Sequence, residues 1–185
     1  WRAGTDAPAS AGFRLAGAHT DSPNLRLKAR PDRAVEGYRQ WGVEIYGGVL
    51  LATWADRDLG LSGRVALRGE DGQVTSRLYR CDRPIARIPN VAIHLNREVN
   101  TKGLILDQQK HLPPVLGTGE GRELRAWLAG ELGCEPGDLL AWELGLHDVV
   151  PPTVGGIDGD FVFAPRLDNQ GCCYAGLMAL LAARP

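Results

Sequence analysis

The sequence predicts an α/β fold that is interrupted by a β-rich insertion. Two apolar, strand-like runs at residues 13–19 and 161–164 lead directly into acidic motifs. Between them, residues 43–79 follow strand patterns, and a single helical pattern follows at 121–133. An insertion explains this order better than two serial domains do. The expected division is a first part, an insertion and a second part, at residues 1–48, 49–141 and 142–185.

Bulk composition excludes several classes of protein. The 185 residues carry 21 Lys and Arg against 22 Asp and Glu, and no basic stretch could follow a phosphate backbone, so we expect no nucleic-acid partner. The longest strongly apolar run, residues 174–183, is shorter than the roughly 20 residues that span a bilayer, so we expect no membrane association. No basic-then-apolar run is visible among the first residues, so no export signal is expected.

Cysteine usage indicates the cytoplasm. The four cysteines follow no metal-finger spacing, and the neighbours Cys172 and Cys173 do not readily bridge each other. We therefore expect free, buried thiols in a reducing compartment and a cytoplasmic protein.

The first half of the chain is predicted as loops and strands. Residues 1–11 are small and polar and indicate a loop, and residues 13–19 indicate a buried strand. Residues 25–28 alternate as a half-exposed strand does, and a polar loop is expected at 31–37. Further strand patterns follow, at residues 43–46, 50–54, 63–67 and 74–79, with a hairpin turn at 70–73 whose Asp-Gly pair favours a tight turn.

The second half contains both predicted helices. Residues 84–116 are punctuated by proline, and a strand is expected at 139–146. Leu124, Trp127, Leu128 and Leu132 recur at helical spacing, and Gly133 provides a stop signal. After the break at Pro151 and Pro152, a strand at 161–164 and a buried helix at 170–183 complete the pattern.

The motif AHTDSP at residues 18–23 presents metal-binding chemistry. Side chains at i and i+2 of an extended segment share a face, so His19 and Asp21 are expected on the same side. Asp21 could then accept a hydrogen bond from one imidazole nitrogen while the other nitrogen binds a metal ion. The alternative is a histidine bonded to a nearby carbonyl, with Asp21 capping a turn.

Asp168 also has two interpretations. In the segment PRLDN, at residues 165–169, it could cap a helix, because Asp and Asn are favoured at helix starts. It could also bridge two divalent ions through its two carboxylate oxygens. Considered alone, Asp168 favours the cap, and its combination with His19 and Asp21 favours the metal.

The other candidates are weaker. His94 lies in an apolar context that is typical of a core histidine, and His111 lies in a proline-rich loop where exposure to a ligand is expected. His147 and Asp148 indicate strand-end capping, and residues 56–58 indicate an ion-paired corner. The serines lack the Gly-x-Ser-x-Gly elbow, which disfavours a serine hydrolase.

Taken in order, these motifs resemble those of the M18 family of metallo-aminopeptidases, the aspartyl aminopeptidases. The resemblance covers nearly the whole chain and is carried by five segments: AHTDSP at 18–23, VEIYGG with WADRDL at 43–59, IPNVAIHL at 88–95, HLPPVL at 111–116 and FVFAPRLDN at 161–169.

The resemblance implies a metalloprotease that removes N-terminal residues, acidic Asp or Glu among them, at a centre of two Zn²⁺ ions or other divalent metals. It implies that His19 and Asp168 bind metal, that Asp21 orients His19, and that His111 lies near the peptide substrate. The β-rich insertion would be a dimerisation domain, giving a homo-oligomer that is a dimer or a dodecamer. It further implies a cis peptide bond between Asp168 and Asn169.

The resemblance also indicates which groups are absent. The family's remaining groups, a Glu-Glu pair that includes the general base, another Asp and a final His, would lie beyond Pro185. We therefore expect the chain to be an incomplete fragment, inactive by itself. The alternative from another class is a catalytically silent dimerisation or assembly module of the same fold.

Overall fold

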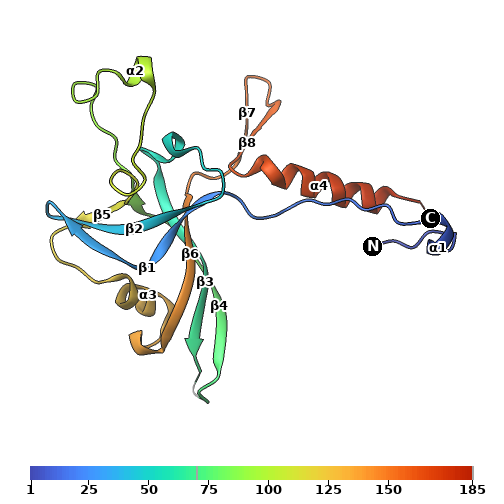
Figure 1. The fold of residues 1–185 in the computed structure, drawn as a ribbon, viewed down its shortest axis with the longest axis horizontal. Coiled ribbons are helices and arrows are strands. Elements are labelled where there is room, and N and C mark those ends of the chain that lie inside the picture. Colours follow the sequence, from blue (N-terminus) through green and yellow to red (C-terminus); the bar gives the residue numbers. More distant parts are fainter. Residues whose placement is uncertain (70, 185) are drawn as a thin grey trace. The chain divides into compact units, whose positions relative to one another are not determined.

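The computed structural model describes residues 1–69 and 71–184, which form two compact units. The barrel unit comprises residues 23–150, and the terminal unit comprises residues 1–22 together with those from Pro151 onward. Figure 1 shows the elements of both units. These limits differ from the expected boundaries near residues 48 and 142. The first two strands and most of the last strand of the barrel unit, which were assigned to the flanking parts, pair within the barrel.

Six strands of the described chain close into an antiparallel barrel in the order β1-β2-β5-β4-β3-β6, with β6 returning to β1 (Figure 1). Their bounds are β1 Asn24–Val35, β2 Tyr38–Tyr46, β3 Asp58–Arg68, β4 Val74–Arg87, β5 Val115–Thr118 and β6 Leu139–Asp148. Closure pairs the strand edges with one another, which satisfies backbone groups that an open sheet would expose.

The predicted loop at residues 31–37 is wrong, because β1 continues through Pro31 to Val35. Asp32 pairs with Trp41 and Val35 with Tyr38, so strand β2 supplies the partner that local polarity could not reveal. Pro31 lies at the register shift between Leu27 and Asp32, where a residue without an N–H is tolerated. The prediction of a half-exposed strand at 25–28 is confirmed, since only Leu25 and Leu27 are buried there.

Strands β3 and β4 form the expected hairpin, with Arg68 opposite Val74. Glu70, part of the predicted turn, lies outside the described residues. The buried apolar side chains of β3 lie at alternate positions and so point into the barrel. The core combines them with residues of other strands: Leu25, Val43, Leu59, Leu61, Val65, Leu67, Leu139, Leu144 and Leu146.

The central helix α3, Leu124–Leu132, confirms the helical pattern. Leu124, Leu128 and Leu132 are buried in the same core as the strands. The ring of Trp127 stands 5.8 Å from Trp41 and 6.1 Å from Tyr79, centroid to centroid. Gly133 ends the helix with φ of 67°, a left-handed conformation that glycine adopts without a Cβ penalty.

The remaining elements of the barrel unit are short. They are the 3₁₀ helices η1 Leu51–Trp54 and η2 Pro136–Asp138 and the helix α2 Val99–Lys102. The predicted strand at 50–54 is wrong, because η1 stands there and contributes no strand ladder. His94 is exposed, which corrects the prediction of a core histidine.

The terminal unit contains α1 Pro8–Ala11, the hairpin of β7 Thr153–Gly155 with β8 Phe161–Phe163, and α4 Leu167–Ala182. The strand predicted at 161–164 is confirmed. The predicted buried strand at 13–19 is wrong: this segment has no strand partner among the described residues, and Phe13 and Leu15 are 80% and 92% exposed. α4 confirms a helix at 170–183 but has no buried residue in the described chain.

No helix of the described residues combines the length and apolar character that a bilayer crossing requires.

Candidate functional site

His19 and Asp21 meet as the i, i+2 spacing predicts. Nδ1 of His19 lies 3.1 Å from Oδ1 of Asp21 and 3.0 Å from the Asp21 carbonyl oxygen. Both partners are acceptors, so Nδ1 must carry the hydrogen. The neutral ring then has its lone pair on Nε2, the nitrogen that remains for a metal ion.

Asp168 lies at the kinked start of α4. The cap position of this helix is Arg166, with φ of 64°, and it forms no side-chain capping hydrogen bond. Asp168 and Asn169 have non-helical backbone angles, and the peptide bond between them is cis, as the resemblance implied. Within the part of the chain that the structure describes, the Asp168 carboxylate has no hydrogen-bond or ion-pair partner.

Two hydrogen bonds join the His19 segment to the start of α4. Nε2 of Gln170 donates to the carbonyl oxygen of Thr20 at 3.2 Å, and Sγ of Cys173 donates to the carbonyl oxygen of His19 at 3.1 Å. The segment that carries His19 and Asp21 therefore lies beside the helix turn that follows Asp168, about 150 positions later in the chain. These contacts were missed by the sequence analysis. The sequence feature that could have indicated them is the i, i+3 spacing of Gln170 and Cys173, which places two hydrogen-bond donors on one helix face.

The donor types at this place suit zinc. Imidazole nitrogen and carboxylate oxygen are both zinc ligands, and a second partner on the far imidazole nitrogen is the usual arrangement. His19 and Asp168 supply two donors, fewer than the three protein ligands of a catalytic zinc site. Accordingly, the described residues contain no cluster of three or more metal-ligating side chains. The residues present fit part of a zinc site.

His111 is exposed on a loop of the barrel unit, as expected from its proline-rich context. Its Nδ1 accepts a hydrogen bond from the Asp107 backbone N–H at 2.9 Å, so the ring hydrogen lies on Nε2. Asp107 accepts hydrogen bonds from the backbone of Lys110 and Gln109, and these lower the pKa of its carboxyl. The loop therefore holds His111 in one orientation.

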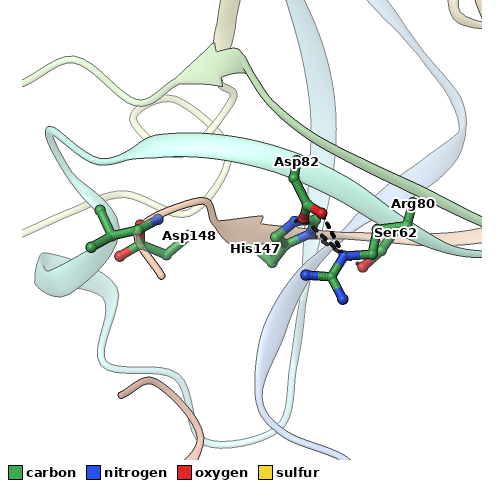
Figure 2. A network of polar contacts seen from close by, with 6 residues as sticks. Ser62, Arg80, Asp82, His147 and Asp148 are labelled. Carbon is green, nitrogen blue, oxygen red and sulfur yellow. Dashed lines mark hydrogen bonds and ion pairs between the residues drawn. The ribbon is translucent and has the colours of Figure 1, made fainter. Parts of the chain in front are cut away.

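Of the two residues expected to cap a strand end, Asp148 does so, since its Oδ1 accepts from the Val150 N–H at 2.9 Å just after β6. His147 does not: it is only 9% exposed and lies within a polar network (Figure 2). Nε2 of His147 lies 3.0 Å from Oδ1 of Asp82, and Ser62 Oγ lies 3.2 Å from Nδ1. Since Asp82 can only accept, Nε2 carries the hydrogen and Nδ1 accepts from Ser62. The three side chains come from β3, β4 and β6, and they tie these strands together.

The acidic corner at residues 56–58 is ion-paired, as predicted. Arg87 Nη1 lies 2.7 Å from Asp58, and Arg57 pairs with Asp148. These residues line a cavity of about 590 Å³ in the barrel unit, which contains none of the candidate site residues. Because its arginines are already paired, we assign it no ligand.

The thiols are free, as expected, but they are not uniformly buried. Only Cys81 is buried in the described chain, Cys134 and Cys173 are half-buried, and Cys172 is exposed.

Comparison with known proteins identifies the family. The family model for the Aminopeptidase I zinc metalloproteases (M18) matches residues 1–184. A probable M18 family aminopeptidase 2 of Streptomyces avermitilis is 50% identical over 173 residues, which cover 92% of this chain and 39% of that protein. The corresponding protein of Mycobacterium leprae is 48% identical over 188 residues, covering 100% of this chain and 44% of that protein. The chain therefore spans about two fifths of the length of these relatives.

Solved structures show the same fold. The chain in a complex of Ape4 and Nbr1 superposes with a TM-score of 0.81 and 38% identity, covering 88% of this chain and 35% of that one. Chaetomium thermophilum mApe1 superposes with a TM-score of 0.79 and 36% identity, covering 90% of this chain and 41% of that one. A chain of the S. cerevisiae mApe1 dodecamer superposes with a TM-score of 0.69 and 29% identity, covering 89% of this chain and 37% of that one.

These matches do not favour a silent assembly module, since the curated relatives are named as aminopeptidases. A family model over almost every residue, with relatives about half identical, shows that the chain belongs to the M18 family of zinc metalloproteases.

Proposed function

We propose that this protein is an aminopeptidase that releases N-terminal residues, acidic Asp and Glu among them, from peptides at a dinuclear zinc centre. One observation carries the proposal. His19 has its Nδ1 engaged by Asp21, and its segment is hydrogen-bonded to the start of the helix that carries Asp168. An oriented imidazole thus lies on a segment adjoining a carboxylate that has no partner among the described residues.

Each residue has a distinct proposed role. His19 would bind one zinc ion through Nε2, Asp168 would bind as the bridging ligand, and Asp21 keeps the hydrogen of His19 on Nδ1. Zinc supplies Lewis-acid polarisation of the scissile carbonyl in such sites. His111, with its hydrogen on Nε2, can donate to a peptide carbonyl oxygen. Asp21 is a positioning residue, since it acts through His19.

The supply of ligands limits what this chain does alone. Two donors fall short of a catalytic zinc site, so we propose that further ligands and the general base come from outside residues 1–185. We propose that subunits pair through the surface of the barrel unit, and that they form a cytoplasmic homo-oligomer. The dodecameric S. cerevisiae relative supports the proposal of a larger assembly.

The test is hydrolysis of Asp-, Glu- and Leu-linked chromogenic substrates by the intact protein, together with its zinc content. His19→Ala and Asp168→Asn should abolish turnover and reduce bound zinc, whereas Asp6→Asn, an exposed carboxylate of the same unit, should change neither. Full turnover after exhaustive chelation, or in Asp168→Asn, would refute the proposal. Hydrolysis by residues 1–185 alone would refute the need for outside ligands.

A further inference from the structure

We propose that Gln170 and Cys173 are positioning residues that clamp the metal-binding segment 19–21 onto the first turns of α4, with Zn²⁺ as the ion whose binding they promote. This inference rests on the proposed function, because it concerns how the zinc site is assembled. Neither residue is itself a metal ligand in the proposal. Both act through the backbone of the segment that carries His19.

The clamp consists of two donors on one helix face. Gln170 and Cys173 are separated by three positions, so their side chains project from the same side of α4. Their acceptors are the consecutive carbonyl oxygens of Thr20 and His19, at 3.2 and 3.1 Å. Two adjacent peptide units are therefore tied to one helix at two points, which restricts rotation of the segment as well as its displacement.

The clamp acts on the backbone next to both proposed zinc ligands, His19 and Asp168. The tied carbonyls belong to the peptide units on either side of Thr20, and the ring orientation of His19 depends on the Asp21 oxygens two residues later. On the helix side, Gln170 is two residues beyond Asp168, whose backbone is non-helical. Loss of the two hydrogen bonds would let the segment move relative to Asp168 while leaving both ligands present.

No strand pairing fixes the described residues that precede the clamp. Residues 13–19 belong to no strand among the described residues, and His19 is half exposed, with a side-chain exposure of 55%. A further hydrogen bond, from Nη1 of Arg2 to the Leu181 carbonyl oxygen at 3.2 Å, joins the N-terminal residues to the opposite end of α4. The ties at Gln170 and Cys173 therefore act directly on the backbone of His19 and Thr20, at the start of the helix.

Cys172 provides a matched control on the same helix. It is exposed and, unlike Cys173, forms no hydrogen bond among the described residues. Cys173→Ala removes the donor, whereas Cys173→Ser retains an O–H donor at the same place. Gln170→Met keeps the length of the side chain and removes its N–H groups.

The experiment measures the zinc dissociation constant of the intact protein by competition with a chromogenic chelator. We expect each single variant, Gln170→Met or Cys173→Ala, to weaken zinc binding several-fold, and the double variant roughly tenfold or more, as for other outer partners of metal ligands. Cys173→Ser should restore the wild-type constant, and Cys172→Ala should leave it unchanged. A double variant within twofold of wild type overturns the proposal.

A second measurement separates the clamp from the proposed function. Hydrogen exchange of metal-free protein reports on residues 17–22 directly, and the double variant should exchange faster there, with no change in Cys172→Ala. If the wild-type protein binds no zinc, both the proposed function and the role of the clamp in zinc binding fail. Faster exchange of residues 17–22 in the double variant would still show that Gln170 and Cys173 hold this segment. Unchanged exchange at 17–22 overturns the clamp whatever the zinc result.

Discussion

The Asp21 carboxylate lies 3.1 Å from Nδ1 of His19 and, with the Asp21 carbonyl oxygen, sets the tautomer of the ring. Both oxygens accept from the same nitrogen, so Nε2 is left with its lone pair. This contact lies within three consecutive residues and was predictable from their spacing. The position of the segment against α4 was not.

Removal of the Asp21 carboxylate should weaken zinc binding without removing a ligand. We expect Asp21→Ala to raise the zinc dissociation constant about tenfold. This is the low end of the effects known for residues that hydrogen-bond to a metal ligand, because the Asp21 carbonyl oxygen still accepts from Nδ1. Asp21→Asn, whose amide oxygen can accept, should lie between Ala and wild type. Chelator competition measures all three, with Asp6→Ala as the control. An unchanged constant in Asp21→Ala would show that Asp21 does not orient His19.

The Asp82–His147 pair predicts a pH-dependent stability. Hydrogen bonds from Arg80, and secondly from His147, hold the pKa of Asp82 below its usual value of 3.8. The unfolded chain therefore takes up a proton at Asp82 before the folded chain does. The stabilisation is complete above the usual pKa and is lost as the pH falls through the lower pKa of the folded state.

Urea unfolding of wild type and Asp82→Asn across a pH series tests this sign. The variant should be less stable at neutral pH, and the gap in unfolding midpoint should narrow as the pH falls below about 4. Asp6→Asn, at an exposed carboxylate of the other unit, is the control for the substitution itself. A gap for Asp82→Asn that widens toward acid would contradict the assignment.

Gly60 makes room for the His147 ring. The two residues are cross-strand partners, and a Cβ on Gly60 would lie 2.8 Å from His147 Nε2 and overlap the Cys81 carbonyl oxygen. We expect Gly60→Ala to destabilise the protein by about 1–3 kcal/mol, since backbone and a buried ring must shift. Gly137→Ala, where nothing lies within 4 Å, is the control for urea unfolding. Equal midpoints for the two variants would mean that the barrel accommodates the methyl group.

Leu128 anchors helix α3 in the barrel core, where it is fully buried. Truncation to alanine should lower the free energy of unfolding by roughly 2–5 kcal/mol, through lost burial and the cavity left behind. Leu78→Ala, on a strand position that is 81% exposed, should have little effect in the same denaturation measurement. A small effect of Leu128→Ala would indicate that α3 does not contribute to the cooperative core.

What the sequence determined by itself is local. The spacing of Leu124, Leu128 and Leu132 with the stop at Gly133 specified α3, because helical periodicity and the left-handed cap depend on neighbouring residues alone. Strand patterns on either side of the Asp-Gly turn likewise indicated the β3–β4 hairpin, a strand was expected where β6 stands, and the i, i+2 spacing indicated the contact of His19 with Asp21.

Tertiary structure decided the features whose partners are distant in sequence. Strand β1 continues through Pro31 because β2 pairs with it, and His147 is buried because Ser62 and Asp82 from two other strands meet its ring. The same holds for the ties of Gln170 and Cys173 to residues about 150 positions earlier. The sequence shows which side chains can donate a hydrogen bond. Which acceptor each one meets depends on how distant parts of the chain pack together, and local sequence patterns carry no information about that packing.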